Sequence, residues 1–231
     1  MKWLYLFFSS LKLGKVLMSA GTMLLSVFTY SLVFGWPYAV GFVALIFIHE
    51  MGHFLAARQR GLAVGLPTFI PFVGAWIQLK DMPHDVETEA YVGLGGPYLG
   101  TIAAIICYLL ARHYDSQLLM ALSYAGFIIN LFNLIPISPL DGGRITAIIS
   151  PRVWLIGAPL LVALFLYQPS PLLILVALFA LPQLYTVWKN RGNKDVYYEA
   201  ALEDRIKYAI WYLGLVALLA YMSYQSYQMI H

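Results

Sequence analysis

Charged residues are scarce in this sequence. Only 11% of its 231 residues are Asp, Glu, Lys or Arg, whereas 61% are hydrophobic, and the mean hydropathy is +0.74. A water-soluble domain usually carries about 25% charged residues. The chain therefore lacks the polar side chains that would cover a water-facing surface, which places it in the membrane class. We expect residues 1–231 to form a single transmembrane domain, with no separate soluble domain.

Cysteine is scarce too, since Cys107, inside an apolar run, is the single one. This excludes a disulfide within the chain and a cysteine metal cluster. The net charge of +3 does not indicate nucleic-acid binding, because the basic residues lie in short loops between apolar stretches. The apolar and basic segment 1–15 shows no clear small-residue cleavage site, so we expect it to be retained.

Long apolar segments dominate what is present. A membrane-spanning helix needs about 20 mostly apolar residues, and six or seven segments approach this length. They predict an all-α membrane protein, a polytopic bundle of six or seven transmembrane helices. The Gln-Pro-Ser-Pro turn at 168–171 predicts a helical hairpin, and Pro159 and Pro182 predict kinks. The segments run from about 16 to 34, 38 to 57, 91 to 111, 118 to 135, 153 to 167, 172 to 188 and 206 to 225.

The distribution of basic residues predicts the orientation. With a cytoplasmic N-terminus and seven crossings, 13 of the 14 Lys and Arg residues lie on the cytoplasmic side, and Arg112 alone lies outside. Such a bias is typical of multi-pass proteins. The count weakens if the first segment lies on the membrane surface instead of crossing it.

Residues 65–79 are apolar but fit no helix, because Pro67, Pro71 and Gly74 interrupt them. We expect extended, hairpin-like backbone that dips into the membrane edge. Such backbone is tolerated there only against protein or a water-filled cavity. The alternative is an amphipathic loop on the membrane surface.

The second apolar segment contains His49, Glu50 and His53. A charged group inside such a segment costs about 3 kcal/mol on insertion scales, so the cluster needs a physical reason. Residues four apart share a helix face, which lets both histidines bind one ion. Glu50 can reach a water on that ion without being a ligand itself. This is the His-Glu-x-x-His pattern of zinc hydrolases.

Asp141 is the predicted third ligand, since a catalytic zinc usually has three protein ligands and an open position. The second and fourth segments cross in the same direction, so both end in the cytoplasmic half. Pro136 and Pro139 break the helix before Asp141, and Gly142 and Gly143 allow close backbone approach. As an alternative or additional role, Asp141 is the N-cap of a short helix at 144–149. Other acidic and histidine side chains lie in a polar loop (His84, Asp81, Asp85, Glu87, Glu89), on the opposite side (His113, Asp115) or at the terminus (His231).

Three stretches carry a resemblance to a known family. The sequence reads His-Glu-Met-Gly-His at 49–53, Asn-Leu-Ile-Pro at 133–136 and Leu-Asp-Gly-Gly at 140–143. This set resembles the site-2 protease family of intramembrane zinc metalloproteases, in its minimal bacterial or archaeal form, over roughly residues 37–151. The sequence shows no PDZ-like or CBS-like regulatory segment, in keeping with the minimal form. The resemblance implies one zinc ion per chain and a prokaryotic plasma membrane.

The resemblance also implies substrate-binding residues. The loop at 71–76 resembles a membrane-inserted hairpin that pairs with substrate, so Phe72, Gly74 and Trp76 are expected to contact it. Asn133 is expected to hold the substrate or stabilise the oxyanion, the alternative being a helix–helix hydrogen bond. Asn130, one turn earlier, is interpreted as structural. The residues Gly-Gly-Pro at 95–97 resemble a family turn, and Gly100 stands where an Asn often follows that turn.

The expected function is hydrolysis of peptide bonds of transmembrane protein substrates within or near the bilayer, as in regulated intramembrane proteolysis. Glu50 would take a proton from the zinc-activated water and pass it to the leaving amine. Two other classes compete: a non-catalytic metal-binding membrane scaffold and a membrane transporter. The clustering of the polar residues argues against a transporter, and the complete ligand set argues against a scaffold. Cobalt or iron would also suit the ligands.

Overall fold

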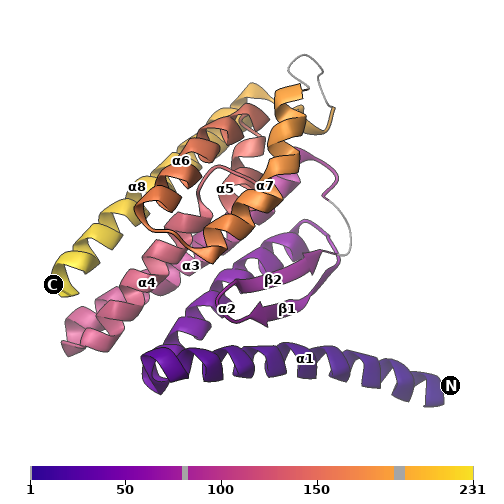
Figure 1. Ribbon diagram of the computed structural model, residues 1–231. Coiled ribbons are helices and arrows are strands. Elements are labelled where there is room, and N and C mark those ends of the chain that lie inside the picture. The colour runs from indigo at the N-terminus through magenta and orange to yellow at the C-terminus, as the bar shows by residue number, and fades with distance from the viewer. Residues whose placement is uncertain (1, 80–82, 190–195, 231) are drawn as a thin grey trace.

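The computed structural model describes residues 2–79, 83–189 and 196–230, with side chains given except at 2–13 and 76–79 (Figure 1). Helices dominate, joined by one two-stranded hairpin and two short 3-10 turns. The elements are α1 (Lys2–Phe34), α2 (Trp36–Gln59), β1 (Val64–Ile70), β2 (Gly74–Leu79), α3 (Val86–Tyr114), α4 (Gln117–Asn133), α5 (Asp141–Ala147), η1 (Pro151–Val153), α6 (Trp154–Tyr167), α7 (Pro171–Lys189), η2 (Val196–Tyr198) and α8 (Leu202–Ile230).

The helices agree with the predicted apolar segments. Five of the described helices are long and apolar enough to cross a membrane, namely α1, α2, α3, α7 and α8. The helix α4 and the segment formed by η1 and α6 are apolar but shorter. All seven predicted segments are therefore helical, which confirms the helical membrane fold, while the number that cross the bilayer stays a prediction.

The boundary between α1 and α2 falls where the sequence predicted a break. Gly35 has a φ of 82°, a left-handed value that glycine tolerates, and Pro37 lies in the first turn of α2. The chain turns there, and Figure 1 shows α1 running at an angle to the other long helices, alongside the hairpin.

The predicted hairpin is confirmed. Strand β1 pairs antiparallel with β2, with Thr68 opposite Trp76 and Phe69 opposite Ala75. The outer edge of β1 is covered by α1: the Ser19 hydroxyl donates to the carbonyl of Pro67, and the Phe69 amide donates to Thr22 Oγ1 over 3.2 Å. These two backbone groups on the outer edge therefore have partners, as irregular or edge backbone at membrane depth requires.

Helices α2 and α3 touch through glycine. A Cβ added to Gly52 would lie 2.2 Å from the carbonyl oxygen of Gly95, and one added to Gly95 would lie 2.6 Å from the carbonyl oxygen of Gly52. Small residues permit this backbone-to-backbone packing in membrane helices. The residues Gly95, Gly96 and Pro97 lie inside the continuous helix α3, so the turn that the family resemblance implied at this point is wrong.

The chain between α4 and α5 is irregular, as its prolines predicted. Gly142 packs so tightly that a Cβ would lie 2.2 Å from the carbonyl oxygen of Leu134. Two aromatic side chains hold the segment: Trp154 Nε1 donates to the carbonyl of Gly143 over 2.8 Å, and the Tyr212 hydroxyl donates to that of Leu134 over 2.6 Å. The later helices α6 and α8 therefore position the segment that carries Asp141.

We expect Gly52→Ala to lower the thermal unfolding midpoint of the detergent-purified protein, because the new methyl group pushes α2 away from α3. Overpacking of this kind typically costs about 1–3 kcal/mol. Gly214→Ala is the matched control, since nothing lies within 4 Å of a Cβ at that helical position. A higher helix propensity should leave that variant unchanged or slightly stabilised. Equal midpoints for the two variants would contradict the close contact.

Candidate metal centre

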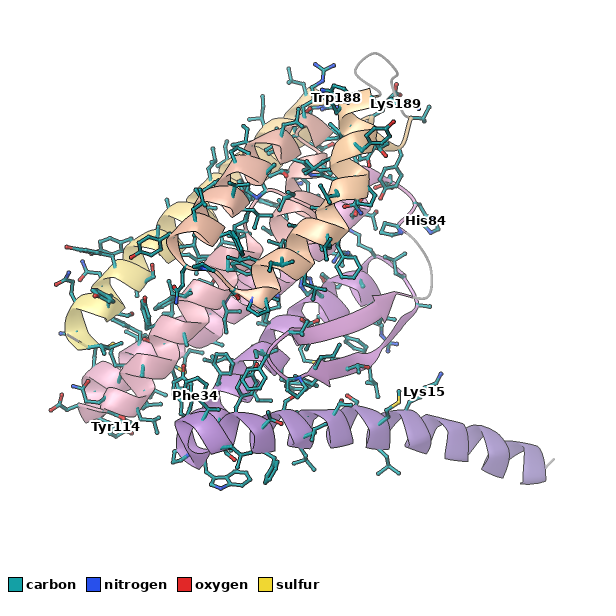
Figure 2. The ribbon with its side chains drawn as sticks, viewed as in Figure 1. Lys15, Phe34, His84, Tyr114, Trp188 and Lys189 are labelled. Atoms are coloured by element: carbon teal, nitrogen blue, oxygen red, sulfur yellow. The ribbon has the colours of Figure 1, made fainter. Side chains whose placement is uncertain are left out.

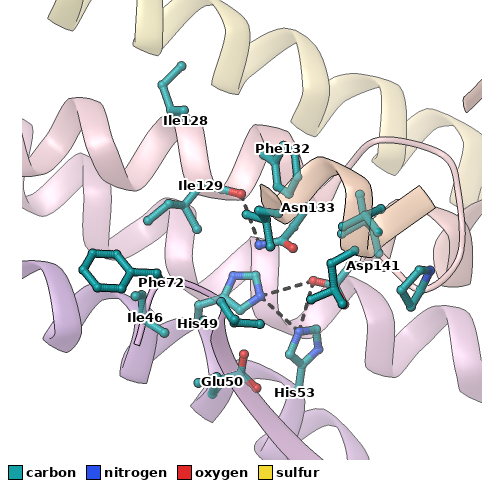
Figure 3. A pocket seen from close by; sticks show the side chains of 18 of the residues that line it. Ile46, His49, Glu50, His53, Phe72, Ile128, Ile129, Phe132, Asn133 and Asp141 are labelled. Atoms are coloured by element: carbon teal, nitrogen blue, oxygen red, sulfur yellow. Dashed lines mark hydrogen bonds and ion pairs between the residues drawn. The ribbon is translucent and has the colours of Figure 1, made fainter. Parts of the chain in front are cut away.

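Helix α2 carries His49, Glu50 and His53 into the interior of the bundle. Each of these residues, and Asp141 at the start of α5, is between 5% and 8% exposed. Figure 3 shows the two imidazole rings and the Asp141 carboxylate pointing toward one another. Buried polar groups without partners are costly, so their convergence calls for a physical explanation.

The convergence is tight. Nε2 of His49 lies 3.1 Å from Nε2 of His53, and each of these atoms lies 3.2 Å from Oδ2 of Asp141. The spacing of four residues on α2 accounts for the first pair, and the irregular α4–α5 connection brings in the carboxylate. The structure thus brings together the three predicted ligands. Leu140, not Asp141, is the N-cap of α5, so the predicted capping role of Asp141 is wrong.

The outer nitrogen of each ring fixes its tautomer. His53 Nδ1 lies 2.8 Å from the carbonyl oxygen of Val92, which can only accept, so Nδ1 carries the hydrogen. For His49, Nδ1 lies 2.9 Å from Oδ1 of Asn130. The Asn130 amide is oriented by its own Nδ2, which donates to the carbonyl of Gly126 over 2.7 Å. Its Oδ1 therefore accepts from His49, whose Nδ1 also carries the hydrogen.

The consequence is electrostatic. In the neutral state of both rings the hydrogens are on Nδ1, so the two Nε2 lone pairs and Oδ2 of Asp141 are three acceptors that face one another. A cation among them converts repulsion into coordination. Two imidazole nitrogens and one carboxylate oxygen are a common donor set of catalytic zinc, so the residues fit zinc. The same donors also suit other divalent transition metals.

Glu50 lies beside this cluster and faces the same cavity (Figure 3). Among the described residues, none makes a hydrogen bond to its carboxylate or holds it in an ion pair. A carboxylate left free in this way can exchange protons with a molecule in the cavity. The sequence-based role for Glu50 as a proton acceptor is thus compatible with its position.

A cavity of about 780 Å³ extends from the cluster between the hairpin, α4 and α7. Of the predicted substrate-binding residues, Phe72, Gly74 and Asn133 line it. The backbone of Trp76 lies in β2, and its side chain is outside the described part of the chain. The other walls are largely apolar and include Ile46, Ile128, Ile129, Phe132, Leu172, Leu175, Val176 and Phe179.

Two site residues were missed by sequence reasoning. Asn130 was interpreted as structural, yet it contacts His49 directly. Arg144 lines the cavity, and its Nη1 lies 3.9 Å from Oδ1 of Asp141, the oxygen turned away from the histidines. A signal existed for both, because an amide inside an apolar segment and a cation three residues after a predicted ligand each need a partner.

Comparisons with known proteins agree with the site. Residues 37–115 match the family model described as Peptidase family M50. A zinc metalloprotease of Methanocaldococcus jannaschii is 28% identical over 199 residues, covering 74% of this chain and 58% of the relative. A probable chloroplastic zinc metalloprotease of Arabidopsis thaliana is 34% identical over 74 residues, covering 30% of this chain and 14% of the relative.

Among solved structures, the site-2 protease from Methanocaldococcus jannaschii aligns with a TM-score of 0.48 and 23% identity, covering 78% of this chain and 90% of that one. The chain spans about three fifths of the length of the archaeal metalloprotease that it matches in sequence. The matched segment 37–115 includes His49, Glu50 and His53. Over residues 37–115, this integral membrane protein is therefore similar to peptidase family M50.

Proposed function

We propose that this protein is an intramembrane zinc metalloprotease that cleaves transmembrane protein substrates within or near the bilayer. The observation that carries the proposal is the convergence of His49, His53 and Asp141 beside Glu50 in a cavity with apolar walls. The three converging residues are the proposed zinc ligands, and Glu50 is the proposed catalytic residue. Residues 1–231 are proposed to form one peptidase domain with its catalytic core at about 37–151.

The chemistry follows from these positions. Bound zinc supplies a Lewis acid that polarises the scissile carbonyl and acidifies water. Glu50 accepts a proton from the attacking water as its oxygen bonds to the carbonyl carbon. Glu50 then delivers that proton to the amine nitrogen as the C–N bond breaks. Asn133 Nδ2 donates one hydrogen to the carbonyl of Ile129 over 3.1 Å, and its second hydrogen is available to the substrate carbonyl oxygen.

The substrate is proposed to bind as an extended segment. A helical peptide bond is shielded by its own hydrogen bonds and must unwind before attack. Since α1 covers the outer edge of β1 through Ser19 and Thr22, the edge available for strand addition is that of β2. The start of β2 at Gly74 and Ala75 lines the cavity, so a strand added there would run past the metal cluster.

The N-terminus is proposed to lie in the cytoplasm of a prokaryotic cell, with the chain in the plasma membrane. Figure 2 supports the alternation of the helices: Phe34 and Tyr114, which end α1 and α3, lie toward one end of the molecule, whereas His84 and Lys189 lie toward the other. This separation agrees with the side assigned to each loop by the basic residues.

The ligand assignment predicts the zinc content of the detergent-purified protein. Wild type should hold about one zinc ion per chain, as a single three-ligand site does. His53→Ala and Asp141→Asn should each reduce this content in elemental analysis. Ser123→Ala, a buried change on α4 away from the cluster, is the control. Zinc retained in Asp141→Asn but lost in His53→Ala would refute the third ligand and direct attention to His84.

The role of Glu50 predicts separate effects on metal and turnover. In Glu50→Gln, zinc content should equal that of wild type, because Glu50 is not a ligand. Cleavage of single-span transmembrane peptides in detergent, followed by mass spectrometry, should fall by about 10²–10⁴-fold. Ser123→Ala should cleave normally. Turnover retained in Glu50→Gln would refute this mechanism.

The proposed docking of substrate at the edge of β2 predicts a cross-linking pattern. The protein carries Cys107→Ala and Glu50→Gln, and a single cysteine is introduced as Ala75→Cys or as Leu66→Cys. Each variant is mixed with a peptide that wild type cleaves and that has one cysteine near its cleaved bond. Adjacent strands lie about 4.8 Å apart, within disulfide reach, so Ala75→Cys on β2 should cross-link. Leu66→Cys on β1 lies one strand further away and should not. Preferential cross-linking at Leu66→Cys would show that β1 is the docking edge.

A further inference from the structure

We infer that Asn130 is a positioning residue that sets the metal affinity of the site through His49, and that Gly100 provides the space its amide needs. The inference rests on the proposed function only in taking zinc as the ion. It concerns a side chain outside the ligand set, on α4, and a backbone position on α3. Neither residue lines the cavity, so neither is placed to touch substrate.

Both ends of the Asn130 amide are engaged. Nδ2 donates to the carbonyl of Gly126 in the same helix over 2.7 Å, and Oδ1 accepts from His49 Nδ1 over 2.9 Å. Asn130 is 3% exposed, so water cannot replace either partner without a rearrangement. Asn133 differs, because its amide donates to a carbonyl of its own helix and it lines the cavity. The two amides, one turn apart, thus have separate roles.

The consequence for the metal follows from the tautomer of His49. In the neutral ring, Nε2 keeps its lone pair for a cation while Asn130 accepts the hydrogen on Nδ1. Without this acceptor, a hydrogen on Nδ1 has no partner in the bundle, and the ring gains by moving it to Nε2. Nε2 then donates to Oδ2 of Asp141, which lies 3.2 Å away. That hydrogen bond occupies two of the atoms that would hold the metal.

His53 is not open to the same change. Its Nδ1 donates to the backbone carbonyl of Val92, an acceptor that no side-chain substitution removes. Among the described residues, Asn130 is therefore the one side chain outside the ligand set that hydrogen-bonds to a histidine of the cluster. Partners of this kind orient metal-bound histidines, and their loss typically lowers metal affinity by about 10–100-fold.

Gly100 explains how the amide fits between the helices. A Cβ at this position would lie 2.4 Å from Oδ1 of Asn130, 2.8 Å from Nδ2 and 2.9 Å from Cγ. Any larger residue at 100 therefore displaces the amide. Glycine inside a helix typically costs about 1 kcal/mol relative to alanine, so a physical reason for it is expected. The space taken by the Asn130 amide is that reason.

The test measures zinc affinity directly, by competition with a chromogenic chelator in detergent, and needs no substrate. Asn130→Ala should weaken zinc binding by about 10–100-fold relative to wild type. Asn130→Leu keeps the buried volume and should weaken binding similarly, which guards against loss of packing as the cause. Ser123→Ala, an equally buried polar residue on α4 that does not contact the histidines, should bind zinc as wild type does.

Gly100 is tested through its coupling to Asn130. Gly100→Ala should weaken zinc binding although the amide is still present. In the double variant Gly100→Ala/Asn130→Ala, the amide that the new methyl group would strike is absent, so binding should be no weaker than in Asn130→Ala alone. Such non-additivity is typical of residues in contact. Fully additive losses would overturn the role assigned to Gly100.

The outcomes separate the two proposals. Absence of zinc binding in folded wild type would refute the proposed function itself. Zinc bound by wild type and equally well by Asn130→Ala and Asn130→Leu would overturn the inference about Asn130 and leave the protease proposal standing. Equal weakening in Ser123→Ala and Asn130→Ala would also overturn it, because any buried polar loss on α4 would then suffice.

Discussion

The contact between α2 and α3 is the constraint on which the site depends. Gly52 and Gly95 let the two backbones touch, and Gly96 leaves room for His53, since a Cβ there would lie 2.2 Å from its Nε2. The same approach places the carbonyl of Val92 against the outer nitrogen of His53. In a bundle surrounded by apolar chains, such small-residue packing replaces the hydrophobic effect as the means of bringing helices together. The His49–His53–Asp141 cluster can therefore form only where the two helices meet without side chains between them.

The second half of the chain supports this centre from outside. Asp141 follows an irregular segment, and irregular backbone inside a membrane needs partners for its polar groups. Trp154 and Tyr212 supply them by donating to the carbonyls of Gly143 and Leu134. Arg205, at the start of α8, extends the same support by donating to the carbonyl of Ile149 over 2.6 Å. Helices that carry no recognisable motif thus hold the third predicted ligand at the required depth.

The sequence predicted what local spacing and segment direction determine. His49, Glu50 and His53 stand out because three ionisable groups share one apolar segment, and Asp141 emerged because few other side chains lie at a matching depth. The pairing of Asn130 with His49 joins residues 81 apart and depends on how α4 packs against α2, which no local pattern encodes. The predicted turn at 95–97 is wrong for a related reason. Pro97 lies inside helix α3, and Gly95 and Gly96 pack against Gly52 and His53 of α2 instead of forming a turn.

Charge balance links these observations to the choice of ion. Asp141 and Glu50 are two carboxylates in a site whose residues are at most 8% exposed, and two adjacent negative charges in a low dielectric repel strongly. Histidines that bind a cation through Nε2 are neutral and add no positive charge, and Asn130 and Val92 accept the hydrogens on their Nδ1 atoms. A divalent cation among the predicted ligands would neutralise both carboxylates at once. Arg144 Nη1 lies 3.9 Å from Oδ1 of Asp141. The guanidinium therefore interacts with the carboxylate through the oxygen that faces away from the histidines, and Oδ2 stays available to a cation.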